Sequence, residues 1–276
     1  MKTILVPFDS SKTSNNTIDY VCGLLKQIKA EKVFILQSLE LNIFGGIVND
    51  NSTDDTFDQR NSIELALKEI TERVQKCAGP DTVVKYAISE FPLLRSVHQA
   101  INELEPDVII AGSDSDEDTS LIGDEIITLS KSSPVPVLVV PSGCKYVTIR
   151  NALVPCNFND LSSLTLLDGL KTIETQEKVK LELLNIYSDE NQLNNKEEVE
   201  LRIADLLVDY DYHFNYSESA NVVDGILDFA DINHVQVIIA LPGKHSFFYR
   251  LTHSSITQAL TQNSSKPVLL LKETEE

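Results

Sequence analysis

The sequence predicts an α/β protein that consists of two tandem, doubly wound domains. Three observations lead to this prediction: the length of the chain, an internal repeat, and the alternation of strand-like with helix-like segments inside each repeat. The chain has 276 residues. Because a domain usually has about 100–150 residues, this length indicates two domains rather than one.

The repeat consists of three short apolar blocks that occur twice in the same order. The pairs are TILVPFD at 3–9 and NALVPCN at 151–157, DVIIAG at 107–112 and QVIIAL at 236–241, and SPVPVLVVP at 133–141 and SKPVLLL at 265–271. The preserved order, with Val-Pro in the first block and Pro-Val in the last, indicates a duplication. The boundary falls near 142–148, which predicts domains at 1–143 and 148–276.

The spacing of the blocks differs between the two halves. The first half has about 19 additional residues near its start. We assign them to a solvated loop at 44–61, because FGGIVNDNSTDDTFDQRN is a mostly polar sequence. Its composition leaves open whether such a loop binds a partner or is a disordered excursion. The first half also has two residues fewer between its second and third blocks.

Strands and helices are expected to alternate within each half. Continuous apolar runs such as KVFIL at 32–36 and VIIA at 108–111 predict strands that are covered on both faces. Between them, apolar residues recur at three- and four-residue steps, which predicts helices. These residues are Ile18, Val21, Leu25 and Ile28, then Ile63, Leu67, Ile70 and Val74, then Leu94, Val97, Ile101 and Leu104, and in the second half Leu164, Leu167, Leu170 and Ile173, followed by Val222, Ile226 and Phe229. Such alternation predicts βαβ units and a parallel sheet.

The composition excludes several classes of protein. Hydrophobic residues make up 42% of the chain and charged residues 24%, which is typical of globular proteins. No apolar run reaches the roughly 18 residues of a membrane-spanning helix, and the start, MKTILVPFDSS, reaches Asp9 too early for a signal peptide. We therefore expect a cytoplasmic protein without a membrane partner. The formal net charge of −19 argues against a nucleic-acid partner.

Residues that could carry chemistry are sparse. The four cysteines are Cys22, Cys77, Cys144 and Cys156. No two of them are spaced as a CxxC motif, so their spacing indicates neither a disulfide framework nor a thiolate zinc site. His245 and His253 have no third ligand at motif spacing, and we expect no metal site. The sequence contains neither a nucleophile elbow nor a P-loop lysine motif, which predicts that the protein is not an enzyme.

The blocks resemble the universal stress protein family. The resemblance rests on ILVPFD at the start, VIIAG before a loop, and the closing SPVPVLVVP. It implies two tandem Rossmann-like domains, each a five-stranded parallel sheet with helices on both faces. It also implies a stress-related regulatory role and pairing of the domains through their last strands, 136–140 and 267–271, which would cover two apolar edges. Some members of the family bind ATP through G-x-x-G-x9-G-[ST] after the fourth strand, and others lack this motif and bind none.

The first half departs from this ATP motif. Gly112 holds the first glycine position, Ser115 stands at the second, and Gly123 comes two residues early. The loop GSDSDEDTSLIGDE is also rich in carboxylates, and two unit charges ~4 Å apart repel by about 4 kcal/mol at an effective dielectric of ~20. We therefore expect no ATP in the first half. Asp9 aligns with an acidic residue that contacts the nucleoside in binding members, but we interpret it as a cap of the turn before the next helix.

The second half keeps the spacing of the motif but not its glycines. Leu241 and Lys244 occupy the two glycine positions, and Ser254-Ser255 forms the terminal pair. Glycine lets the backbone approach a phosphate because no Cβ intervenes, and this advantage is lost here. We favour the interpretation that the aromatic run FFY at 247–249 fills the space that a nucleotide would take.

Together these observations predict a non-enzymatic regulatory or interaction module whose protein partners the sequence does not identify. The alternative is an adenine-nucleotide-binding switch that binds ATP in the second half only. Its ligand residues would be Asn157, Lys244, Ser254 and Ser255. Asn157 replaces Asp9 at the end of the first strand, and we interpret it too as a cap. An enzyme that hydrolyses ATP is the least favoured class, because no catalytic constellation is present.

Overall fold

The computed structural model covers both copies of the three repeated blocks. It describes residues 2–38, 52–113, 126, 128–130, 132–158, 161–173, 178–187, 196–241, 260 and 263–272. For residues 52–59 and 172 it describes the backbone without the side chain. The repeat found in the sequence can therefore be followed strand by strand in the fold.

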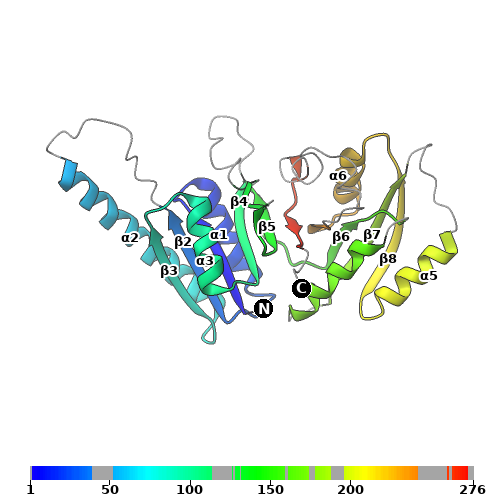
Figure 1. Cartoon of the computed structure of the whole chain (residues 1–276), viewed down its shortest axis with the longest axis horizontal. Helices are drawn as coiled ribbons and strands as arrows, with labels where there is room; N and C mark the ends of the chain where they lie inside the picture. The colour runs from blue at the N-terminus through cyan, green and yellow to red at the C-terminus, as the bar shows by residue number, and fades with distance from the viewer. Residues whose placement is uncertain are drawn as a thin grey trace.

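In the described part of the chain, ten strands form one continuous sheet (Figure 1). They are β1 (Thr3–Phe8), β2 (Lys32–Ser38), β3 (Val83–Ser89), β4 (Val108–Ser113), β5 (Val137–Pro141), β6 (Asn151–Pro155), β7 (Lys180–Tyr187), β8 (Asp211–Glu218), β9 (Val237–Ala240) and β10 (Val268–Leu270). Across the sheet the order is β3-β2-β1-β4-β5-β10-β9-β6-β7-β8. Each half contributes five strands, and both halves have the same order from the outer edge inward.

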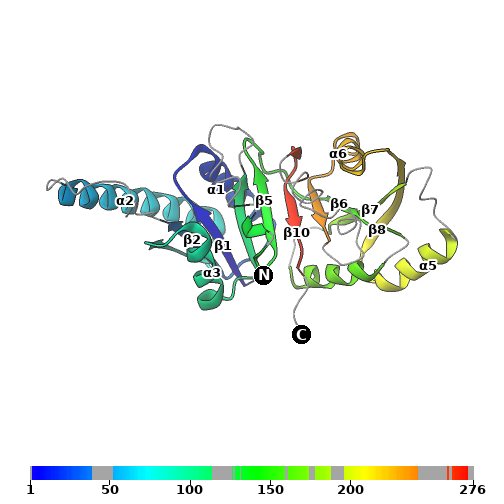
Figure 2. The ribbon, with the colours of Figure 1, turned by 45° about the horizontal axis from the view of Figure 1, so that its top comes forward.

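The two halves meet at the centre of the sheet, where β5 and β10 lie side by side (Figure 2). These two strands are antiparallel, with Val137 opposite Leu270 and Val139 opposite Val268. The other neighbouring strands pair in parallel. The strands of one half therefore run in the opposite direction to those of the other.

Helices cover both faces of this sheet. They are α1 (Lys12–Leu24), α2 (Ser52–Ala78), α3 (Leu93–Leu104), η2 (Ser162–Thr172, a 3₁₀ helix), α5 (Lys196–Leu206) and α6 (Val222–Ile232). One core cluster joins α1, α2, η2 and α5 to one face, and a second joins α3 and α6 to the other. Along β1, Ile4 and Val6 belong to the first cluster and Leu5 to the second, as the alternation of a strand requires. The predicted α/β fold class is confirmed.

The second half uses a tighter helix where the first half has α1. Its predicted apolar residues, from Leu164 to Ile173, recur strictly every three residues. A 3₁₀ helix has 3.0 residues per turn, so this spacing places them on one side of it. The structure has a 3₁₀ helix there, and Leu164 and Leu167 are buried in the core.

The loop predicted at 44–61 is wrong over its second part. Residues 52–61 belong to α2, which begins at Ser52 and runs to Ala78, whereas residues 44–51 lie outside the described part of the chain. Polar composition is shared by loops and by helix turns that face solvent. The composition of this segment therefore does not distinguish the two, and periodicity emerges only from Ile63 onward.

The segment between β5 and β6 is held against the end of α1. The buried amide of Gln27 donates to the carbonyl of Ile149 (2.6 Å), and its Oε1 accepts from the Ile149 N–H (2.8 Å) and from the hydroxyl of Tyr146. The Tyr146 ring also packs edge-on against Tyr20, with centroids 5.3 Å apart. The second half of the chain is thus anchored to the first helix before its first strand begins.

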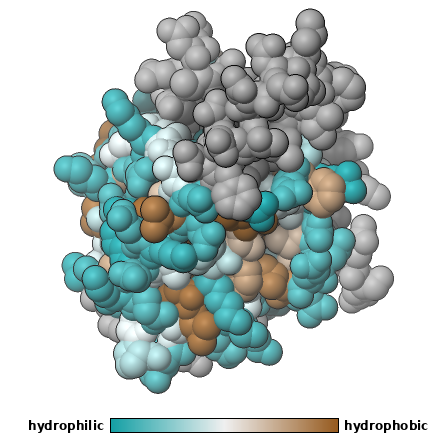
Figure 3. Space-filling view, turned by 90° about the vertical axis from the view of Figure 1, so that its left-hand side faces the viewer, coloured by the Kyte–Doolittle hydropathy of each residue, from teal (hydrophilic) through white to brown (hydrophobic). Residues whose placement is uncertain are grey.

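The end of the molecule that carries α2 and β3 is mostly hydrophilic, with small separate apolar patches (Figure 3). Leu65 of α2 is 62% exposed and Val83 of β3 is 48% exposed. Scattered apolar residues of this kind are normal on a protein surface. None of the helices in the described ranges combines the length and the apolarity that are needed to cross a membrane.

Replacing Gly23 with alanine should destabilise the protein. A Cβ at this position would overlap the Cβ and Cγ atoms of Tyr146, which lie too near the backbone to swing away. We expect a loss of about 1–3 kcal/mol in the free energy of unfolding, as for other overpacked sites, measured by urea denaturation.

Gly169 provides the matched control. Nothing lies within 4 Å of a Cβ built on it, and it does not have a positive φ. Gly169→Ala should leave stability unchanged or raise it by up to about 1 kcal/mol, because alanine restricts the unfolded chain. Equal effects of the two substitutions would contradict the close contact between α1 and Tyr146.

Candidate ligand sites at the strand ends and at the midline

The carboxyl end of the first-half sheet contains a small cavity. Its volume is about 170 Å³, and its described lining includes Phe8 at the end of β1, Asp9 directly after it, Thr13 of α1, Gly112 of β4 and Leu93 of α3. Ligands of open parallel sheets bind in this kind of place, beyond the carboxyl ends of strands where the strand order reverses. Asp9 and Gly112, which the sequence singled out, therefore lie at one site.

Asp9 shapes the turn that leads into α1. Its Oδ1 accepts a hydrogen bond from the N–H of Ser11 (3.0 Å), across Ser10, whose φ is +66°. Ser11 is the N-cap of α1, and its Oγ accepts from the N–H of Ser14 (3.0 Å). An Asp side chain that bonds the backbone two residues on is a common turn device. This geometry agrees with the capping role expected for Asp9.

At Gly112, α1 passes close to β4. A Cβ built on it would lie 2.5 Å from Oγ1 of Thr17 and 2.7 Å from Cγ2 of Thr13. Thr17 in turn donates its hydroxyl to the carbonyl of Thr13 (2.9 Å), which fixes its side chain in place. The missing side chain of Gly112 therefore makes room for a helix.

In the second half, core side chains occupy the corresponding positions. Leu241, which stands where Gly112 stands in the first half, is buried in the core cluster. Asn157 follows β6 and is half-buried. The next residue, Phe158, is buried and packs edge-on against Phe214 (5.9 Å) and Tyr216 (5.4 Å). An aromatic cluster therefore lies next to Asn157.

The remaining residues of the predicted sites fall outside the described part of the chain. They are Ser115 and Gly123 in the first half, and Lys244, His245, the aromatic run 247–249, His253, Ser254 and Ser255 in the second. The predictions about them stay predictions. Within the described ranges, no group of three or more His, Cys, Asp or Glu side chains is arranged to hold a metal ion.

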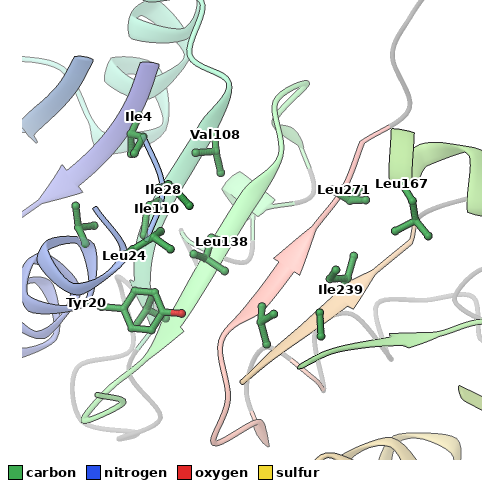
Figure 4. Packing of buried hydrophobic residues seen from close by; sticks show 14 of the residues in the cluster. Ile4, Tyr20, Leu24, Ile28, Val108, Ile110, Leu138, Leu167, Ile239 and Leu271 are labelled. Atoms are coloured by element: carbon green, nitrogen blue, oxygen red, sulfur yellow. The ribbon is translucent and has the colours of Figure 1, made fainter. Parts of the chain in front are cut away.

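A larger cavity lies at the midline of the sheet, between the end of α1 and η2. Its volume is about 960 Å³. Apolar side chains of β4, β5 and β9, among them Ile110, Leu138 and Ile239, line it together with Leu271, which directly follows β10 (Figure 4). Cavities of about 300–1,000 Å³ with such a lining are the usual size for small-molecule sites. Both halves of the chain contribute to this one.

Charged residues lie at the borders of the midline cavity. Lys171 of η2 pairs with Asp168 (3.0 Å) and Asp209 (2.8 Å), and its hydrogen bonds to the two carboxylates raise its pKa. Lys272, just after β10, donates to the carbonyl of Ser130, and burial lowers its pKa. A lysine that is partly removed from water in this way loses part of its preference for the charged form.

The midline cavity could not be predicted from the sequence. Its lining comes from segments that are far apart in the chain, and it exists only once β5 and β10 are neighbours. The predicted pairing of the last strands was the one feature from which the proximity of Leu138 and Leu271 could have been inferred. The size of the space also depends on how close η2 lies, which apolar periodicity does not report.

The model of the universal stress protein family matches residues 1–141. The chain belongs to this family. No curated protein matches the chain. The universal stress protein match covers the first half, and in the structure the second half repeats its strand order.

Solved structures with the same fold include a universal stress protein from Archaeoglobus fulgidus. It is 16% identical, with a TM-score of 0.66, and the match covers 98% of this chain and 96% of that one. A functionally unknown protein from Pseudomonas aeruginosa is 14% identical with a TM-score of 0.55, covering 99% and 92%. The cytoplasmic domain of a prokaryotic cation chloride cotransporter is 12% identical with a TM-score of 0.54, covering 99% and 96%. At these identities the matches show a shared fold.

Gly112→Ala should destabilise the protein by about 1–3 kcal/mol, because the new methyl group would overlap Thr13 and Thr17. Urea denaturation measures the loss. Adding Thr17→Ala, which removes the nearest atom, should recover part of the lost stability, since the two sites are in contact and their effects are not additive. A Gly112→Ala protein as stable as the parent would mean that α1 does not press on β4 as described.

Proposed function

We propose that this chain is a non-enzymatic stress-response module that regulates by binding other proteins, and that its first half does not bind ATP. The proposal that the first half does not bind ATP rests on the contact of α1 with Gly112. In the family's ATP motif the glycines let the backbone approach phosphates. Here the space above Gly112 is taken by Thr13 and Thr17, so the glycine serves helix packing.

The size and charge of the first-half site support this proposal. Its cavity of about 170 Å³ is smaller than the roughly 300 Å³ at the lower end of small-molecule sites. Asp9 lines it, and one carboxylate oxygen is engaged by the N–H of Ser11. The sequence that follows β4 adds further carboxylates. A triphosphate would meet like charge at this end of the sheet.

The pairing of the two halves supports a regulatory module that is complete within one chain. Val139 and Val268, opposite each other on β5 and β10, are both buried. An exposed apolar strand edge invites unwanted pairing with other chains. We propose that the antiparallel contact is the intrachain equivalent of a dimer interface, which leaves the outer surfaces of both halves for protein partners.

We propose no catalytic role. Cys156 follows β6 at the carboxyl end of the sheet, where a nucleophile could act, but it is buried, and this burial raises the pKa of its thiol. Reactive cysteines lie in accessible, electropositive surroundings that lower the pKa. The shared fold carries no information on activity, since one fold hosts many functions; the cotransporter domain with this fold belongs to a transport protein.

The alternative function is a switch that binds an adenine nucleotide in the second half. The terminal Ser254-Ser255 pair and Lys244 retain the spacing and the positive charge that an anion would favour. Against it, Leu241 places a buried side chain where the motif has its first glycine. For this reason we favour a regulatory module that binds no nucleotide.

Freshly purified protein should release no stoichiometric nucleotide when it is denatured and analysed by mass spectrometry. Calorimetric titration with ATP should also give no binding heat up to about 1 mM ligand, a Kd limit that corresponds to about −4 kcal/mol. One adenine nucleotide per chain would overturn the proposal. Two variants would then locate the nucleotide. If Ser255→Asp loses nucleotide binding and Asp9→Ala retains it, the nucleotide binds in the second half.

A further inference from the structure

Two cysteines that are far apart in the sequence meet between α1 and α2. Cys22 lies near the end of α1 and Cys77 near the end of α2, and the Cys77 thiol is close enough to raise the pKa of the Cys22 thiol. The two helices pack side by side on the same face of the sheet (Figure 1). The spacing of the cysteines along the chain gave no indication of this pair, because the fold alone brings them together.

An ion pair one turn away fixes the distance between the same two helices. Nη2 of Arg73 lies 3.2 Å from Oδ1 of Asp19. Arg73 precedes Cys77 by four residues and Asp19 precedes Cys22 by three, so on each helix the charged residue and the cysteine share a face. The two cysteines therefore lie about one turn further along the same helix interface.

The two thiols differ in access to solvent. Cys22 is buried, and burial followed by the hydrogen bond to Cys77 raises the pKa of its thiol to about 12. Cys77 is only half-buried, so an oxidant can reach it first. The guanidinium of Arg73 acts on Cys22 in the opposite sense, since a nearby positive charge lowers the pKa of a thiol.

We propose that Cys22 and Cys77 form a reversible disulfide when the chain meets a hydroperoxide such as hydrogen peroxide. The Cys77 thiol gives up its proton, and the thiolate attacks one peroxide oxygen; the O–O bond breaks, and the hydroxide that leaves takes up that proton to become water, which gives a sulfenic acid. The sulfur of Cys22 then attacks the sulfur of Cys77; the S–S bond forms, and the hydroxyl group leaves with the proton of Cys22 as a second water. Two thiols are oxidised and one peroxide is reduced to two waters.

The disulfide would join α1 to the last turn of α2. It would close a loop that contains β2 and most of α2, and a cross-link across a loop of this length restricts the unfolded chain strongly. The packing of α1 on β4 at Gly112 lies on the same helix, so oxidation would fix the arrangement of the first half. A dithiol reductant would reverse the bond by thiol–disulfide exchange.

The test treats the purified full-length chain with a small excess of hydrogen peroxide and then blocks and counts its thiols under denaturing conditions. We expect the count to fall from four to two, the intact mass to fall by two hydrogens, and a non-reducing digest to contain a cross-linked pair of peptides with Cys22 and Cys77. The oxidised chain should melt roughly 5–10 °C higher than the reduced one, and dithiothreitol should restore all four thiols.

Variants separate this pair from the other cysteines. Cys144→Ser should still form the cross-link, whereas Cys77→Ser should not form it. Cys22 is buried, and Cys22→Ser would weaken the fold. The test therefore uses the variant of the half-buried Cys77 and the non-reducing peptide map of the unsubstituted chain. A cross-link that contains Cys144 or Cys156, a cross-link between two chains, or a count that stays at four would overturn the proposal.

Discussion

The antiparallel contact of β5 with β10 is the constraint on which the rest of the molecule depends. It is short, since three residues of β10 pair with β5, yet it turns two five-stranded sheets into one of ten strands. Both core clusters run across it without interruption, one on each face. The midline cavity, the position of η2 opposite α1, and the path of the connecting segment past Gln27 all follow from where these two strands meet.

The two halves reach the same strand order with different packing. In the first half a full α-helix lies on β4, and a glycine is the residue that permits this approach. In the second half a narrower 3₁₀ helix takes that place, and Leu241 extends into the core instead. The two copies of a duplicated sequence can thus keep the same topology while different residues fill the same point of the core.

Much of the fold was predictable because it depends on buried apolar runs, which the sequence displays directly. TILVPF and its partner strands, and the helices around Val97 and Ile226, are examples. The α2 segment from Ser52 was missed because polar residues do not distinguish a solvent-facing helix from a loop. At the site, the turn-forming role of Asp9 follows from local chemistry. The crowding above Gly112 does not, since it depends on how close two distant elements approach.

The opposite directions of the two halves have a consequence for recognition. Because β5 and β10 are antiparallel, Asp9, which follows β1, and Asn157, which follows β6, lie at opposite ends of the strands of the sheet. A ligand or protein segment that contacts one of these two residues is therefore remote from the other residue. Open parallel sheets bind ligands beyond the carboxyl ends of their strands, and the two halves of this chain place those ends on opposite sides of the sheet.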